Sequence, residues 1–286
     1  MCILNVKRLA FATLIAAFSF TSIALADELV KFDSASYRVG LLQQRLARER
    51  GETPRELPGT PIEGYLTKPE GPGPFPAVVM LHGCEGWAEA SRQERAAWFT
   101  NLGYVSFAVD SFATRGIKEA CDQDMPERQA DAWGALFYLS KIDFVDPQRV
   151  AVVGWSQGGI VALEIASARP FKAFNIPDDL EFKAVVAFYP LCRVAADQMS
   201  MPTLVLIGEL DDWTPATDCQ RWLERNAGKG APIKLVIYPG AFHAFDASSL
   251  GEGKRSFGHR LKYDPDADER SKTEMRNFLA IQLGAR

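Results

Sequence analysis

The chain has 286 residues, of which 47% are hydrophobic and 24% are charged. This composition is typical of a globular protein with enough apolar material for a sizeable core. The formal net charge of −4 gives no general attraction to nucleic acid or to anionic membranes, so the composition argues against both as partners.

The first 26 residues have the pattern of a secretory signal peptide. Lys7 and Arg8 precede an apolar stretch that ends in Ala24-Leu25-Ala26, a small-x-small cleavage signal. We expect cleavage after Ala26 and a secreted or periplasmic protein with no stable membrane association. The alternative is an uncleaved membrane anchor, although the stretch is short for a spanning helix and rich in Ala, Ser and Thr.

Export changes the interpretation of the cysteines. Cys2 lies in the signal segment, and Cys84, Cys121, Cys192 and Cys219 remain. Four cysteines in an oxidising compartment suggest up to two disulfides, with three possible connectivities. Their spacings do not resemble the CxxC motifs of zinc or redox sites.

Beyond the signal segment, strand patterns alternate with helix patterns. A peripheral helix is predicted within residues 35–50, and a half-buried strand within residues 62–69. Short apolar runs without strict alternation, typical of strands buried on both faces, occupy residues 77–82, 104–110, 149–155, 183–190, 202–208 and 233–240. Helices are predicted near residues 89–102, 126–142, 158–168, 216–227 and 268–283. This alternation indicates an α/β fold, with a mostly parallel, doubly wound sheet flanked by helices.

No internal repeat or interdomain linker interrupts this pattern, so we expect residues 27–286 to form a single domain. The longest excursion between predicted core elements is residues 169–182. It could form part of a small cap over the C-terminal edge of the sheet.

Gly154-Trp155-Ser156-Gln157-Gly158 matches the G-x-S-x-G pattern of a nucleophile elbow. The pentapeptide alone is weak evidence, because Ser156 could be merely a small residue in a tight turn. A buried strand before it and an Ala-rich helix after it favour a nucleophile. The flanking glycines permit close approach of strand and helix, and the Gln157 N–H lies at a helix N-terminus, where negative charge is favoured.

A nucleophilic serine needs a base, because a free hydroxyl is almost fully protonated at neutral pH. The chain has three histidines. His243 follows the last predicted strand, which places it at the same edge of the sheet as Ser156. His82 also reaches that edge but precedes Ser156 in the chain, and His259 lies in a polar loop where we expect it to be solvated.

The acid that orients the base should lie between serine and histidine in the chain. "LIGELDDWTP" offers Glu209, Asp211 and Asp212 just past a strand. We choose Asp211, with Asp212 as the alternative; the cluster could also be a solvated turn that caps a helix. The order Ser156, Asp211, His243 then reproduces Ser…Asp…His.

A second oxyanion donor should come from the turn after an earlier strand, and "LHGCEGW" occupies that place. We assign the backbone N–H of Cys84, paired with that of Gln157. Because this role uses only the main chain, the Cys84 thiol stays free for a disulfide.

Together these segments resemble the dienelactone hydrolase family of the α/β-hydrolase fold. The resemblance spans most of residues 60–285 and is carried by "HGCEGW", "DSFATRGI", "DPQRVAVVGWSQGG", "FYPLC", "GELDDWTP" and "AFHAFD". It implies hydrolysis of a carboxylic ester or lactone through Ser156, His243 and Asp211, by way of an acyl-enzyme. No metal or organic cofactor is implied.

One departure from the family affects the substrate. The name-giving enzymes carry a Cys nucleophile where this chain has Ser156, and they hold a small carboxylate-bearing lactone partly with arginines. Arg115 falls near one such arginine, so the resemblance implies that it binds substrate; a loop arginine tied to nearby carbonyls is the alternative. The serine and the export signal weaken transfer of that substrate but not of the reaction class.

The resemblance also implies a disulfide pairing. In this fold the strands before Cys84 and before the Cys121 loop are neighbours, as are those before Cys192 and Cys219. The pairs Cys84–Cys121 and Cys192–Cys219 follow from that.

Two other functions compete with an esterase or lactonase. One is a serine hydrolase that acts on amides or peptides. The other is a non-catalytic binding protein on the same fold, against which a complete set of nucleophile, acid, base and oxyanion donors argues.

Overall fold

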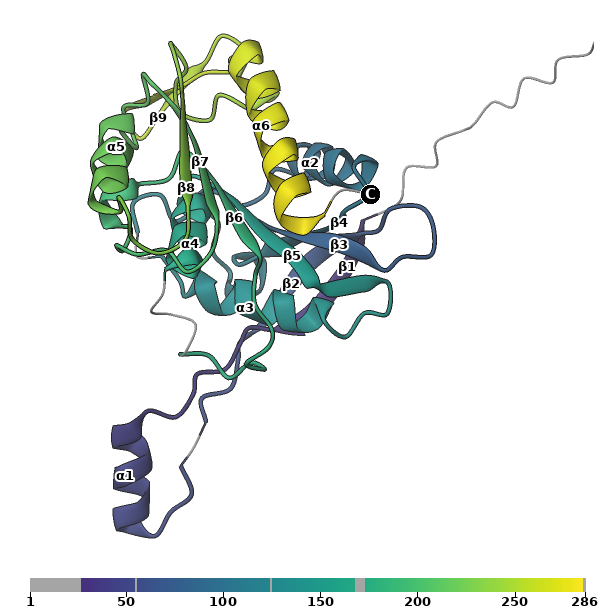
Figure 1. Cartoon of the computed structure of the whole chain (residues 1–286), viewed down its shortest axis with the longest axis vertical. Coiled ribbons are helices and arrows are strands. Elements are labelled where there is room, and N and C mark those ends of the chain that lie inside the picture. The colour runs from purple at the N-terminus through teal and green to yellow at the C-terminus, as the bar shows by residue number, and fades with distance from the viewer. Residues whose placement is uncertain (1–26, 55, 124, 168–172, 285–286) are drawn as a thin grey trace, which may run out of the picture.

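The computed structural model describes residues 27–54, 56–123, 125–167 and 173–284, so the expected signal segment lies outside the described residues. An eight-stranded sheet in the order β1-β2-β4-β3-β5-β6-β7-β8 forms its centre (Figure 1). The strands are β1 (Glu28–Asp33), β2 (Pro61–Thr67), β3 (Phe75–Leu81), β4 (Val105–Asp110), β5 (Val145–Trp155), β6 (Ala184–Phe188), β7 (Thr203–Gly208) and β8 (Ile233–Tyr238). A separate hairpin pairs β9 (Lys254–Ser256) with β10 (His259–Leu261).

The expected mostly parallel sheet is confirmed. Strands β4, β3, β5, β6, β7 and β8 run parallel, whereas β2 is antiparallel to both of its neighbours. All seven residues of β3 are buried, as the unbroken apolar run predicts. Edge strand β1, whose alternating pattern buries only Val30 and Phe32, and the β9–β10 hairpin were not predicted from the sequence.

The helices are α1 (Leu41–Arg50), α2 (Glu89–Asn101), α3 (Arg128–Leu139), α4 (Gln157–Ala166), α5 (Ala216–Arg225) and α6 (Pro265–Leu283). All of these except α1 lie against the sheet and together cover both of its faces. Helices α2 and α6 lie together on one face, whereas α3 and α4 pack on the other, and α5 lies beside β8 (Figure 1). Among the described residues, none of the helices combines the length and apolar character required to cross a bilayer.

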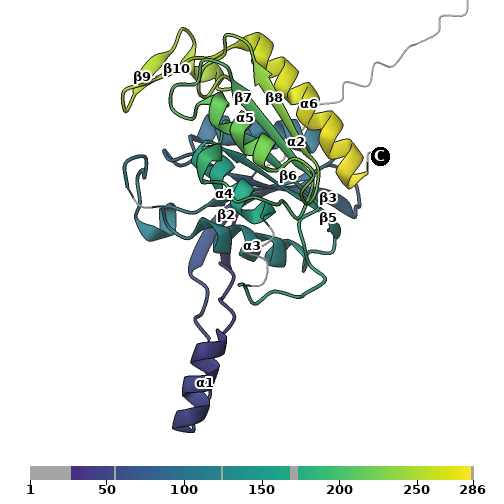
Figure 2. The ribbon, with the colours of Figure 1, turned by 60° about the vertical axis from the view of Figure 1, so that its left-hand side comes forward.

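Helix α1 stands away from the rest of the molecule (Figures 1 and 2). The predicted peripheral helix is present, but within it only Ala47 is buried. Leu41 and Leu42 are 85% and 68% exposed. Its apolar residues therefore do not pack against the core.

The described part of the long excursion, residues 173–182, is not a cap over the C-terminal edge. The ring of Phe182 packs 5.0 Å from that of Trp133 on α3. Lys183 N–H donates to the carbonyl of Val150, where the buried part of β5 begins. The expectation was wrong because α4 runs back along the sheet, so the connection to β6 lies at the N-terminal edge.

Candidate active site

Four loops meet at the C-terminal edge of the parallel strands. They follow β3, β5, β7 and β8, whose carboxyl ends lie at one edge because the strands are parallel. These loops carry Cys84, Ser156, Asp211 and His243. The topology thus gathers residues that are far apart in the sequence.

Ser156 occupies a sharp turn between β5 and α4. Its φ of 53° is a left-handed conformation that is costly for a residue with a side chain. A Cβ at Gly154 would lie 2.0 Å from the carbonyl oxygen of Gly158, and one at Gly158 would lie 2.2 Å from that of Leu81. Both positions therefore require glycine, which is the steric role predicted for them.

His243 lies between the serine and an acid. Its Nε2 is 3.0 Å from Ser156 Oγ, and its Nδ1 is 2.7 Å from Asp211 Oδ2. The ring is buried and packs against Tyr189 and Trp213, with centroids 4.6 and 5.1 Å away. A proton on Nδ1 that is donated to the carboxylate leaves Nε2 free to accept the proton of the serine.

Asp211 is buried and fully hydrogen-bonded. Its Oδ1 accepts from the N–H groups of Trp213 and Thr214 at 2.9 and 2.8 Å, and its Oδ2 accepts from Thr214 Oγ1 at 2.9 Å. In the sequence, Thr214 precedes Pro215 at the start of a predicted helix, and nothing there indicates that its hydroxyl contacts Asp211. Asp211 therefore makes both sets of contacts: it accepts from the N–H groups of the turn, as a helix cap does, and it also contacts His243.

The other two acids of the cluster face away from His243. Asp212 Oδ1 accepts from the N–H of Arg260 at 3.0 Å, and its side chain is 49% exposed. Glu209 accepts from the N–H of Gly240 at 3.0 Å. Of the three candidates, only Asp211 contacts the histidine.

His82 is a buried structural residue. Its Nδ1 donates to the carbonyl of Gly83 at 2.7 Å, and its Nε2 accepts from the N–H of Ser111 at 3.3 Å. Burial, followed by the charge of Arg128, holds the pKa of His82 well below its usual value. The ring is therefore neutral near pH 7, and both of its nitrogens are already occupied.

His259 was expected in a polar loop, but the structure places it in a strand. It belongs to β10 and stacks on Trp213, with ring centroids 5.0 Å apart and an interplanar angle of 14°. The sequence has no apolar alternation in this short strand that would have revealed the stacking.

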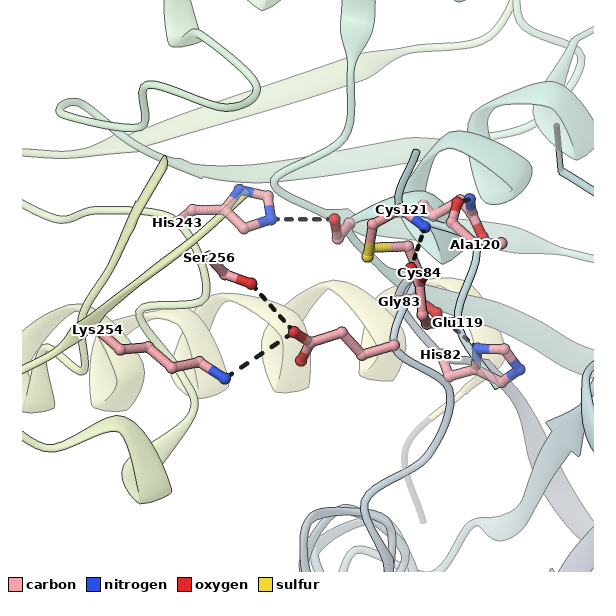
Figure 3. The surroundings of a disulfide bond; sticks show 12 residues. His82, Gly83, Cys84, Glu119, Ala120, Cys121, His243, Lys254 and Ser256 are labelled. Atoms are coloured by element: carbon pink, nitrogen blue, oxygen red, sulfur yellow. Dashed lines mark hydrogen bonds and ion pairs between the residues drawn. A yellow bond between two sulfur atoms is a disulfide. The ribbon is translucent and has the colours of Figure 1, made fainter. Parts of the chain in front are cut away.

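The loop after β3 lies beside the serine. A Cβ built on Gly83 would be 3.6 Å from that of Ser156. Cys84, the next residue, is joined to Cys121 by a disulfide, and its carbonyl accepts from the N–H of Ala120 at 2.8 Å (Figure 3). A second disulfide joins Cys192 to Cys219. Both pairs are those that the family resemblance implies.

Gln157 is the first residue of α4, so its N–H belongs to the helix turn that lacks intrahelical acceptors. Its side chain is held on both sides. Oε1 accepts from Arg128 at 2.9 Å, and Nε2 donates to the carbonyl of Ala120 at 3.0 Å. The same guanidinium donates to the carbonyl of His82 at 2.7 Å. The sequence gives no signal for this role of Arg128, because an arginine in a predicted helix ordinarily faces solvent.

A cavity of about 270 Å³ opens above the serine. Ser156 and His243 line it. Its other lining residues include aromatic side chains and three charged ones, namely Trp87, Trp155, Tyr189, Trp213, Glu85, Arg95 and Lys254. Glu85 accepts from Ser256 Oγ at 3.3 Å and lies 3.9 Å from Lys254 Nζ, so the β9–β10 hairpin borders this cavity (Figure 3).

Arg115 does not line this cavity. Its two terminal nitrogens each lie 2.7 Å from an oxygen of Asp131, and one of them also donates to the carbonyl of Ser111 at 2.7 Å. The guanidinium therefore joins its loop to Asp131 on α3. The alternative expectation, a loop arginine tied to nearby carbonyls, describes the contact to Ser111, whereas the pair with the Asp131 carboxylate was not expected.

Comparisons with known proteins agree with this architecture. The model of the family described as "Dienelactone hydrolase family" matches residues 62–283. An uncharacterized protein of Mycobacterium tuberculosis is 30% identical over 202 residues, which cover 65% of this chain and 69% of that protein.

Two solved structures share the fold. A dienelactone hydrolase-like promiscuous phosphotriesterase from metagenomic libraries aligns with a TM-score of 0.62 and 22% identity, over 91% of this chain and all (100%) of that chain. A propionate-bound esterase of Thermogutta terrifontis aligns with a TM-score of 0.60 and 17% identity, over 79% of this chain and 90% of that chain. This is the α/β-hydrolase fold.

Proposed function

Because the chain belongs to the dienelactone hydrolase family, we propose that it is a serine hydrolase that cleaves carboxylic esters or lactones. The observation that carries this proposal is the continuous line of contacts from Ser156 Oγ through His243 to Asp211, at 3.0 and 2.7 Å, beside a cavity. Hydrogen-bonded serine, histidine and aspartate in this geometry are what nucleophilic acyl transfer requires.

In the proposed reaction, Ser156 Oγ attacks the acyl carbonyl while its proton passes to His243 Nε2. Asp211 holds the imidazole in the required tautomer and stabilises its charged form. The carbonyl electron pair moves onto oxygen, which accepts from the N–H groups of Cys84 and Gln157. When the C–O bond to the leaving group breaks, the alkoxide takes the proton from Nε2. Water then attacks the acyl-enzyme by the same steps, and the acid and free serine are released.

We further propose a small, uncharged substrate. The cavity of about 270 Å³ lies near the lower end of the usual range of drug-sized pockets, which begins at about 300 Å³. Its charged groups are already paired, since Arg95 lies 2.8 Å from Asp246 and Lys254 lies near Glu85. Arg115, the residue that the family resemblance offered for a substrate carboxylate, is bound to Asp131. A neutral ester or lactone therefore fits these walls better than an anionic one.

A fluorophosphonate probe tests the proposal most directly, because it reacts only with an activated serine. Wild type should be labelled at Ser156 and should hydrolyse p-nitrophenyl acetate, whereas Ser156→Ala should do neither. Ser271→Ala, which removes a buried hydroxyl from α6, is the matched control and should retain both activities. Unlabelled wild type, under conditions that label a control esterase, would support a binding protein instead.

We also propose export, with residues 1–26 removed as a signal peptide and residues 27–286 forming one domain. The two disulfides support an oxidising compartment, where such bonds persist. Export predicts a mature N-terminus at Asp27. Sequencing the N-terminus of protein recovered from a secretory host tests this, and retention of Met1 on the folded protein would contradict it.

A further inference from the structure

We infer that Asp246 is the positioning residue that fixes the proposed nucleophile and base relative to each other. Its side chain is 8% exposed and lies three residues after His243. No part of it reaches the Ser156–His243–Asp211 line of contacts directly. The inference rests on the proposed function, since it concerns the geometry of that same site.

Three donors from three different elements converge on this one carboxylate. Oδ1 accepts from the hydroxyl of Tyr189, which follows β6, at 2.7 Å. Oδ2 accepts from Trp155 Nε1, at the end of β5, at 2.9 Å, and from Arg95, on α2, at 2.8 Å. An ionised carboxylate is the only common side chain that can accept all three bonds without presenting a donor.

Each bond holds a group that touches the site. Trp155 directly precedes Ser156, so its indole fixes the strand from which the strained serine turn departs. Tyr189 packs its ring 4.6 Å from that of His243 and thereby limits the tilt of the imidazole. Asp246 itself lies on the loop that carries His243.

Arg95 is the charged partner of the carboxylate. Its guanidinium lies 4.5 Å from the Trp155 ring, so it contacts both the acceptor and one of the other donors. Although burial alone disfavours the cation, the charge of Asp246 raises the pKa of Arg95. Burial and the same negative charge raise the pKa of Tyr189 well above its usual value, so the phenol stays a donor. The cluster is thus fully occupied and rigid.

Asp246→Asn is the informative variant because it preserves shape while replacing one acceptor by a donor. We expect kcat to fall about tenfold or more with KM within about twofold, because a misplaced reacting group slows chemistry more than it weakens binding. Fluorophosphonate labelling of Ser156 should slow by a similar factor. Asp268→Asn is the matched control: that carboxylate, 7% exposed, pairs with Lys272 at 2.8 Å on α6, and its loss should leave kcat within about twofold.

A double-mutant cycle separates positioning from general stability. Tyr189→Phe removes only the hydroxyl and keeps the ring on His243. If Asp246 acts through Tyr189, the kcat losses of Asp246→Asn and Tyr189→Phe should be less than multiplicative when combined. Purely multiplicative losses, or equal kcat in folded Asp246→Asn and wild type at matched melting temperature, would overturn the inference. Ser156→Ala, assayed in parallel, distinguishes failure of the proposed function from failure of the role of Asp246. If Ser156→Ala stays active, the proposed function is wrong, and the role of Asp246 is wrong with it.

Discussion

Arg128 donates to Gln157 Oε1 at 2.9 Å, so a helix on one face of the sheet holds the residue that follows the proposed nucleophile. The same guanidinium donates to the carbonyl of His82, in the loop that leads to Cys84. One buried cation therefore joins both segments whose N–H groups are proposed to stabilise the oxyanion. Burial lowers its pKa to about 10, which leaves it charged near pH 7.

Arg128→Lys should impair catalysis without weakening substrate binding. A lysine keeps the charge but cannot reproduce the forked contact to two acceptors, so one loop is released. We expect kcat on p-nitrophenyl acetate to fall about tenfold or more with little change in KM, because oxyanion contacts strengthen in the transition state. Arg149→Lys is the control, since Arg149 also donates to two acceptors but lies at the start of the buried part of β5. Equal kcat in the two variants would refute the role of Arg128.

Asp211→Asn and Asp212→Asn should differ sharply. An amide at position 211 presents a donor to His243 Nδ1 and favours the wrong tautomer, for which a loss of about 10⁴-fold in kcat is known in serine proteases. Asp212 contacts the N–H of Arg260 and is half exposed, so its replacement should cost less than about threefold. Steady-state kinetics of both variants decide the assignment. A larger loss at position 212 would move the acid one residue along the chain.

The two disulfides should have separable effects. Each closes a chain segment, with sequence separations of 37 and 27 residues, and chain entropy predicts about 3–4 kcal/mol of stabilisation from each. Replacing Cys84 and Cys121 by alanine should also lower kcat, because it frees the loop that carries a proposed oxyanion donor. Replacing Cys192 and Cys219 should lower stability alone. Urea unfolding and kinetics on the same samples test this, and unchanged kcat in the first pair would contradict it.

His82 should make the protein less stable in acid. Its pKa is held below the usual value of about 6.5 in the folded state, so below that pH the unfolded chain binds a proton that the folded chain does not. The sign is therefore a loss of stability as pH falls through about 6.5. Urea unfolding of His82→Gln should show a smaller fall in stability over the same pH range. His259→Gln, which removes a half-exposed ring, should behave like wild type; equal pH dependence in all three proteins would disprove the assignment.

Much of the fold was predictable because its signals are local. Strand β3 and the buried part of β5, residues 150–155, appear as unbroken apolar runs, and the alternation of such runs with helices indicates a parallel sheet. Edge strand β1 was missed because most of its residues are exposed, and the β9–β10 hairpin was missed because each of its strands has only three residues. Residues 173–182, the described part of the expected cap, do not cover the C-terminal edge, because α4 returns the chain to the opposite edge of the sheet.

The sequence by itself determined which residue types stand at the ends of the strands: the glycines around Ser156, the acids before α5 and the histidine after β8. The backbone conformation at such positions, for example the left-handed turn at Ser156, is indicated by the neighbouring residues in the sequence. Only the tertiary structure decided which acid faces His243, and only it brought Arg128 to Gln157 and three donors to Asp246. Such contacts join residues 29 to 151 positions apart, and they depend on side-chain direction and burial, which no periodicity along the chain encodes.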